Sequence, residues 1–182
     1  CQHTSANKTE GSTQDFSAVG RLLLHSSNMS IIHTVTFQNT TIYIHSINII
    51  FYGCCFNNTS VYATGQMNQY LTFRNSTWID SGIFKIIVNQ YQHIEFYQCK
   101  FANIFNYNKT LILLHHNKNI HLKNCLFSNI SGIILNCWSS LTVFFNQLVV
   151  WNSHSLHNPK IQSLYIFRFL DNIILFSIMG VA

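Results

Sequence analysis

The sequence contains few charged side chains. Of its 182 residues only 8% are charged, with five Asp and Glu against ten Lys and Arg, whereas about a quarter is usual. The ten basic residues are scattered and form no basic run, so we expect no nucleic-acid interface. Hydrophobic residues make up 48% of the chain, which is enough to build a sizeable core. Solubility must therefore come from something other than charge.

The shortage of carboxylates argues against common polysaccharide-cleaving chemistry, which needs clustered acids for calcium binding or hydrolysis. The acids are Glu10, Asp15, Asp80, Glu95 and Asp171, and they lie far apart in the sequence. We therefore predict no catalytic residue and no cofactor. The ten His and six Cys show no CxxC or HxxxH spacing, so we expect no metal site.

A long uninterrupted apolar run is also missing. The most apolar segment lies near the C-terminus, where Arg168 and Asp171 interrupt it, so we predict no membrane span. What the chain has instead is Asn-X-Ser/Thr sequons, at about twice the frequency expected by chance. They begin at Asn7, Asn28, Asn39, Asn57, Asn58, Asn75, Asn108 and Asn129. This excess predicts a secreted or cell-surface glycoprotein whose glycans supply solubility.

A repeat runs through the chain. Apolar residues recur nine, seven, four and two positions before an Asn or Asp that ends each copy. The closing residues are Asn39, Asn58, Asp80, Asn103, Asn129 and Asn152, with a weaker seventh copy formed by Leu164, Phe167, Phe169 and Asp171. Copies of 19 to 26 residues indicate a solenoid.

The repeat predicts short strands joined by bends. The positions at minus nine and minus seven alternate as a half-buried strand does, and the step to minus four marks a bend. Stacked coils would place equivalent side chains about 4.8 Å apart. One internal stack would hold Phe51, Phe73, Phe96, Leu122 and Phe145, and another would hold Phe37, Phe56, Trp78, Phe101, Phe127 and Val150. We predict an all-β solenoid of about seven coils over residues 30–182, preceded by a polar arm or cap at 1–29.

The closing Asn column predicts a sharp corner, because Asn tolerates the left-handed backbone conformation. Stacked Asn side chains can also form a hydrogen-bonded ladder. The predicted ladder is Asn39, Asn58, Asp80, Asn103, Asn129 and Asn152. A buried ladder Asn cannot carry a sugar, so the predicted glycosylation sites are Asn28, Asn57, Asn75 and Asn108, with Asn7 if the arm is accessible.

These copies resemble the parallel β-helix repeat of the pectate lyase-like superfamily. The segments NIHLKNCLFSNISGIIL and HIEFYQCKFANIF are similar to that family's coil with its Asn corner, and the resemblance covers residues 30–172. It implies a right-handed parallel β-helix. The alternative is a leucine-rich repeat. The segment YQHIEFYQCKF also fits the strand pattern of that repeat, with Cys99 at its Asn/Cys position. The segments after each Asn are β-branched and lack Leu-spaced helices, which favours the β-helix.

Outward-facing positions form the candidate ligand-binding site. Six residues before each corner lie His33, Tyr52, Arg74, Tyr97, Lys123, Asn146 and Tyr165, and eight before lie Glu95 and His121 on successive coils. Tyr rings can stack on sugars, and cations can pair with acids or rings. The predicted binding residues are Tyr52, Arg74, Tyr97, Lys123, Glu95 and His121. A solvated face held by cross-strand pairs is the alternative reading, and a Glu95–His121 acid–base pair is a third.

Cys99 and Cys125 fall on consecutive coils in one inward column, so they are a disulfide candidate; two reduced core thiols fit equally well. The function we expect is a non-enzymatic extracellular scaffold glycoprotein, with partners at open β-helix ends through continuation or end-to-end stacking into filaments. The alternatives are a glycan-binding adhesin and a polysaccharide lyase or glycoside hydrolase.

Overall fold

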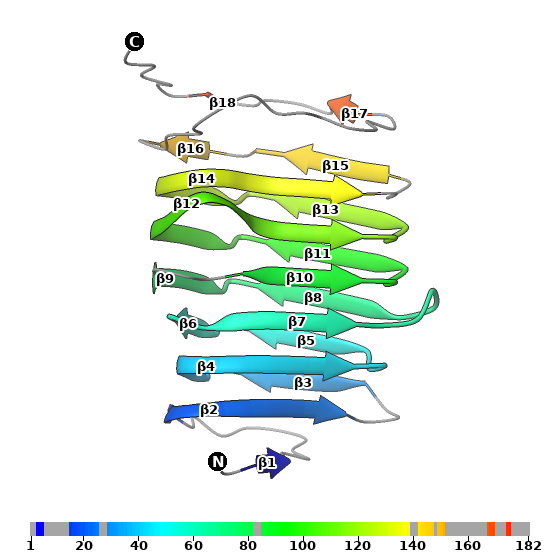
Figure 1. Ribbon diagram of the computed structural model, residues 1–182. Coiled ribbons are helices and arrows are strands. Elements are labelled where there is room, and N and C mark those ends of the chain that lie inside the picture. Colours follow the sequence, from blue (N-terminus) through cyan, green and yellow to red (C-terminus); the bar gives the residue numbers. More distant parts are fainter. Residues whose placement is uncertain are drawn as a thin grey trace.

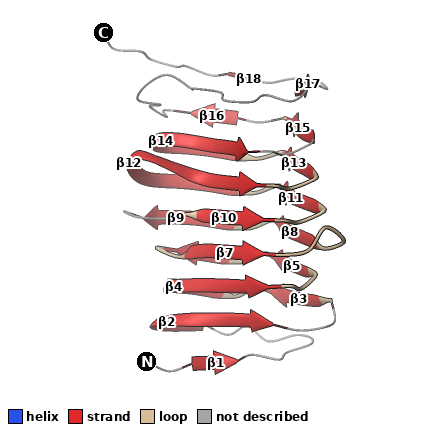
Figure 2. Cartoon of the chain, turned by 45° about the vertical axis from the view of Figure 1, so that its right-hand side comes forward, coloured by secondary structure: helices blue, strands red, loops and turns tan. Residues whose placement is uncertain are grey.

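The chain is a parallel β-solenoid (Figure 1). The computed structural model describes residues 3–5, 15–25, 29–81, 85–138, 142–147, 149–151, 167–169 and 174–175. Every regular element among these residues is a strand (Figure 2), and every strand pairing is parallel. The prediction of an all-β stack of coils is therefore confirmed.

Eighteen strands make up the described part of the solenoid. They are β1 (His3–Ser5), β2 (Asp15–His25), β3 (Ser30–His33), β4 (Thr36–His45), β5 (Ile49–Tyr52), β6 (Cys55–Asn57), β7 (Ser60–Thr64), β8 (Tyr70–Arg74), β9 (Thr77–Ser81), β10 (Ile86–Asn89), β11 (His93–Tyr97), β12 (Lys100–His115), β13 (Asn119–Lys123), β14 (Leu126–Trp138), β15 (Thr142–Asn146), β16 (Val149–Trp151), β17 (Phe167–Phe169) and β18 (Ile174–Leu175).

The coils present three faces. The first face is the seven-stranded sheet β17-β15-β13-β11-β8-β5-β3, which takes one strand from each coil. The second face contains β6 and β9 with the N-terminal parts of β4, β12 and β14. The third face contains β7 and β10 with the C-terminal parts of the same three long strands. The second and third faces together form one eleven-stranded sheet, because the long strands continue around the Asn corner.

The coil is right-handed. In Figure 1 the nearer strands, such as β10 and β7, run to the right, and the fainter, more distant strands of the first face run to the left. The strands climb from β1 and β2 at the bottom to β15 and β16 near the top, and this combination defines a right-handed turn.

Three bends separate the faces, and each uses left-handed backbone. The first bend holds Thr34, Gly53, Asn75, Gln98, Asn124 and Gln147, one per coil, all with φ between 49° and 63°. The second is the Asn corner, where Asn39, Asn58, Asn103 and Asn129 have φ between 45° and 55°. The third holds Ser46, Gln90 and His116. Hydrogen bonding continues through the first bend, where Asn75 N donates to Tyr97 O over 2.9 Å.

The core contains the predicted vertical stacks of rings, beside columns of buried aliphatic side chains. Phe56 and Trp78 are stacked with ring centroids 4.5 Å apart, and Trp78 and Phe101 follow at 4.6 Å. In the parallel stack, Phe73 and Phe96 lie 5.0 Å apart. The Cα of Phe96 is in register with that of Leu122. Each of these side chains is essentially fully buried, so hydrophobic burial and ring stacking hold successive coils together.

The weak seventh copy is out of the predicted frame. Its pattern aligned Phe167 with Leu148, but Phe167 is instead in register with Val143, five residues earlier. Phe167 and Phe169 therefore lie in a strand of the first face, whereas the predicted frame aligned Phe169 with Val150 of the second face. At the other end, β2 lies within the segment predicted as an arm or cap and pairs with β4, so residues 15–25 are a strand of the same sheet.

Candidate functional site

The outer side of the first face brings the predicted binding residues together. The positions six before each corner form one row, in which Arg74 is in register with both Tyr52 and Tyr97. Tyr97 is in turn in register with Lys123. The positions eight before each corner form a second row, in which Glu95 and His121 are partners. Parallel pairing in strict register thus aligns these side chains along the solenoid axis. The remaining position of the predicted stripe, Tyr165, lies outside the described residues.

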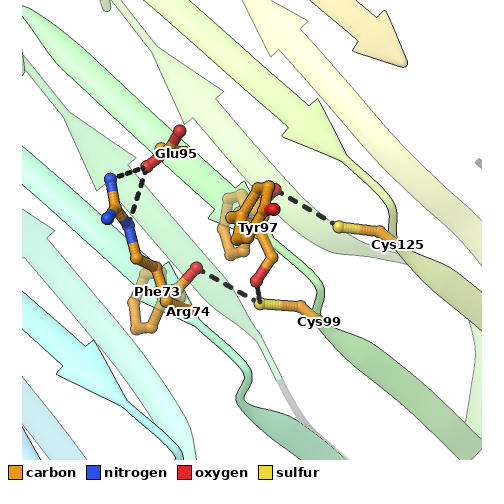
Figure 3. Close-up of polar contacts among 7 residues, drawn as sticks. Phe73, Arg74, Glu95, Tyr97, Cys99 and Cys125 are labelled. Carbon is orange, nitrogen blue, oxygen red and sulfur yellow. Dashed lines mark hydrogen bonds and ion pairs between the residues drawn. The ribbon is translucent and has the colours of Figure 1, made fainter. Parts of the chain in front are cut away.

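An ion pair links the two rows. The Arg74 guanidinium donates to Glu95 Oε2 through Nε at 3.1 Å and through its terminal nitrogen at 2.8 Å (Figure 3). The Arg74 side chain is 48% exposed and that of Glu95 is 18% exposed. An exposed pair of this kind contributes less than about 1 kcal/mol. Its main effect is to occupy the carboxylate, since the hydrogen-bond partner of Glu95 among the described residues is Arg74 and not His121.

A cation–π contact joins the next two coils. The Lys123 ammonium lies 5.7 Å from the centroid of the Tyr97 ring, within the range of a favourable contact. At the other end of the row, the His33 and Tyr52 rings lie 5.4 Å apart. Tyr52 remains 42% exposed, so its ring is available for contacts outside the chain.

A chain of rings that the sequence reading missed runs beside these pairs. His93 and His121 meet edge to face at 4.7 Å, and His121 meets Phe144 at 4.7 Å. Tyr70 lies 6.0 Å from His93. The available signal was the position ten before the corner, which is also outward and holds Tyr70 and His93 on consecutive coils.

Burial is the main influence on both histidines. It lowers the pKa of His93, against a smaller raising effect of Glu95. It also lowers the pKa of His121, and the charge of His93 acts in the same direction. Both rings are therefore biased towards the neutral form. The described part of the chain contains no group of three or more His, Cys, Asp or Glu side chains that could hold a metal ion.

The inward Cys column consists of free thiols. Cys99 Sγ lies 3.3 Å from the carbonyl oxygen of Phe73 (Figure 3), and Cys125 Sγ lies 3.3 Å from that of Phe96. The disulfide candidate Cys99–Cys125 is therefore two free thiols in this structure, each donating to the backbone of the preceding coil. Burial raises the pKa of the Cys99 thiol, and burial also raises the pKa of Cys54 to about 11, so both stay protonated.

The Asn corner carries an amide ladder on its outside. Asn58 Nδ2 donates to Asn39 Oδ1 over 2.8 Å, and Asn129 Nδ2 donates to Asn103 Oδ1 over 2.9 Å. All four of these residues are exposed, whereas the sequence argument had assumed that a ladder Asn would be buried. The other ladder position of the described chain, Asp80, lies in β9, and Asn152 lies outside the described residues.

The predicted glycosylation sites differ in accessibility. Asn75 is exposed at the first bend, whereas Asn57 is half-buried within β6. Asn108 lies in β12 where the register with β14 shifts between Phe105 and Thr110. Asn7 and Asn28 lie outside the described residues.

No protein-family model matches the chain, and no curated protein matches its sequence. Among the described residues, no helix has the length and apolar character needed to cross a membrane.

Proposed function

We propose that the chain is a non-enzymatic β-solenoid scaffold of an extracellular or cell-surface glycoprotein. The observation that carries the proposal is that the polar side chains of the outer first face are paired with one another across coils. Glu95 is held by Arg74 and Tyr97 is covered by Lys123. A face of this kind stabilises the stack, and its carboxylate is already hydrogen-bonded.

Secretion and glycosylation are supported by the sequons and by the position of Asn75. This Asn is exposed at a bend, where a glycan extends into solvent without crossing a strand. Glycans would also replace the solubility that charged residues supply in most proteins. We further propose that the chain is a non-enzymatic relative of the pectate lyase-like β-helix proteins, on the basis of the Asn corner and the right-handed coil.

Assembly along the axis is the specific form of scaffold that we propose. A stack of parallel strands grows by adding strands at an open edge, so subunits that meet end to end would continue the two sheets. Negative-stain microscopy of the secreted chain tests this assembly. We expect fibres whose width is that of one solenoid, and a monodisperse monomer at all concentrations would contradict the filament form.

The enzymatic alternative is tested by turnover. We expect the secreted chain to release no reducing ends and no unsaturated products from acidic or neutral polysaccharides. Turnover that Glu95→Gln abolishes, with Glu10→Gln as the matched control, would contradict the scaffold proposal and assign Glu95 a catalytic role.

Glycan binding is the second candidate function, because two tyrosines of the outer first face are strongly exposed. Tyr52 is 42% exposed and Tyr70 is 48% exposed, and exposed Tyr rings are suited to stacking on sugars. A glycan array is the direct measurement. A ligand whose binding is lost in Tyr52→Ala and Tyr70→Ala, but kept in Tyr62→Ala on the third face, would support this candidate, and an array without any ligand would remove it.

A further inference from the structure

We infer that Asn39 is an N-glycan attachment site, although it belongs to the amide ladder, and that its ladder partner Asn58 is not. This inference rests on the proposed secretory route and identifies the modified side chain. Both residues begin a sequon, Asn39-Thr40-Thr41 and Asn58-Thr59-Ser60, so sequence alone does not distinguish them. The direction of the hydrogen bond between them does.

The ladder has a polarity. In both amide–amide bonds the later coil donates through Nδ2 and the earlier coil accepts through Oδ1. Asn39 therefore takes part only as an acceptor, and its Nδ2 makes no hydrogen bond to any described residue. The preceding coil offers no Asn at this corner, because β2 has Ala18 and Val19 there, where its register with β4 shifts between Ser17 and Gly20. The amide nitrogen that would receive a sugar makes no hydrogen bond to a described residue in Asn39, whereas in Asn58 it lies 2.8 Å from Asn39 Oδ1, so a sugar on Asn58 would have to fit beside the preceding coil.

The backbone around Asn39 also suits a glycan. The residue is exposed and lies at a left-handed corner with φ of 50°, so its side chain leaves the solenoid at an edge. Asn57, which shares an overlapping sequon with Asn58, is half-buried in a strand that pairs on both sides with β4 and β9. A sugar at Asn57 would cover the second face, whereas one at Asn39 would project from the corner.

The covalent step is an ordinary glycosyl transfer. A host transferase uses an oligosaccharide linked through pyrophosphate to a polyisoprenyl lipid. The bond from sugar C1 to the pyrophosphate oxygen breaks, and the pyrophosphate leaves with the bonding electrons. A bond forms between C1 and Asn39 Nδ2, and the nitrogen gives up one of its two protons to a base of the transferase. The remaining side-chain oxygen, Oδ1, still accepts the hydrogen bond from Asn58, so the ladder persists in the glycosylated protein.

The experiment compares two substitutions that each remove a sequon hydroxyl, at residues that are neighbours in the sheet. Thr41→Ala removes the sequon of Asn39 without altering that Asn, and Ser60→Ala removes the sequon of Asn58 in the same way. Thr41 and Ser60 are register partners on β4 and β7, so each variant is the structural control of the other. The full chain is secreted from a eukaryotic host, and intact mass is measured before and after peptide-N-glycosidase treatment.

We expect Thr41→Ala to lose the mass of one glycan and Ser60→Ala to lose none. An unchanged mass in Thr41→Ala, or a lost glycan in Ser60→Ala, would overturn the inference. Glycosidase release in ¹⁸O-water maps the sites of the unsubstituted chain and gives the same answer without any variant. If Asn75 and other sequons are glycosylated but Asn39 is not, only this inference fails. If no sequon is glycosylated, the proposed secretory function fails with it.

Discussion

At the scale of single residues, the stacks and the bends contribute differently to stability. The stacked rings are buried and identical in environment from coil to coil, so each loss leaves a cavity between two neighbours. Most of the bend residues are exposed, but their left-handed backbone costs roughly 1–2 kcal/mol for a residue with a Cβ. Stability therefore depends on both inward volume and corner conformation.

Removing one ring from the stack should weaken the fold strongly. Phe96→Ala deletes a fully buried ring that packs on Phe73, and we expect a loss of about 3–5 kcal/mol in the free energy of unfolding. Urea denaturation measures the change, and Tyr52→Ala, on the outer side of the same face, is the control, with an expected change within about 0.5 kcal/mol. Equal losses for the two variants would contradict the assignment of inward and outward positions.

Replacing a strained corner residue should strengthen the fold. Thr34 is a β-branched residue at φ of 50°, and Gly adopts this conformation freely, so we expect Thr34→Gly to stabilise by about 0.5–1 kcal/mol. The control is Thr36→Gly in β4, where Gly weakens a strand and the sign should reverse. Thermal unfolding of both variants measures the difference, and destabilisation by Thr34→Gly would exclude the left-handed bend.

At the scale of elements, contacts between neighbouring strands couple the outer first face to pH. His93 of β11 and His121 of β13 both have a pKa lowered from its ordinary value, chiefly by burial. The unfolded chain therefore binds protons more readily than the folded one. The folded state has its full stability above the unfolded pKa, near 6.5, and loses it as pH falls below that value.

We expect the unfolding midpoint to fall as the pH is lowered from about 7 to 5. The groups that face the two histidines are Tyr70 and Arg74 of β8, Glu95 of β11, Lys123 of β13 and Phe144 of β15. The variant His93→Gln/His121→Gln should reduce the slope, leaving the part that comes from His115, whose pKa is also lowered by burial. If the double variant keeps the same slope of unfolding midpoint against pH as the unsubstituted chain, the pH dependence arises from other groups.

A close approach between strands and bends gives another test at this scale. A Cβ added to Gly65 would lie 2.7 Å from the Tyr91 ring, which is fully buried. We expect Gly65→Ala to destabilise by about 1–3 kcal/mol through overpacking. Denaturant unfolding measures this loss. In a Tyr91→Leu background, Gly65→Ala should cost less than it does in the unsubstituted chain, and an equal cost would mean that the ring is not the obstacle.

The same scale explains how far the sequence predicted the structure. Inward periodicity predicted the stacks and the Asn corner, because burial imposes the same residue class on every coil. It did not predict the contact of Arg74 with Glu95 or that of His93 with His121. The contacts of outward side chains depend on which rotamers they adopt, and burial does not fix those rotamers. The first bend was expected from the broken alternation. Its occupants Thr34, Gly53 and Gln98 share no residue class, so no pattern identified their left-handed backbone.

In the described part of the molecule, the strands of each coil pair with those of the coils next to it, and the Tyr91 hydroxyl also donates to the Ile47 carbonyl oxygen two coils away. The first face supplies one strand for each of seven coils, and equivalent residues lie along the axis. The sequence repeat did not align the seventh coil correctly, because that copy of the repeat is weak. It did not predict β2, because residues 1–29 are polar. The proposed scaffold role depends on this linear geometry, since a rod extends by repetition of its coils.

Distances along the outer row test this geometry most directly. Spin labels introduced through unnatural amino acids, which avoid the native thiols, are placed at His33 together with Tyr97, Lys123 or Asn146, which lie three, four and five coils away. We predict that pulsed electron–electron double resonance gives distances between the two labelled positions that increase by about 4.8 Å for each coil, from about 14 to 24 Å. Distances that do not increase in equal steps would contradict the solenoid.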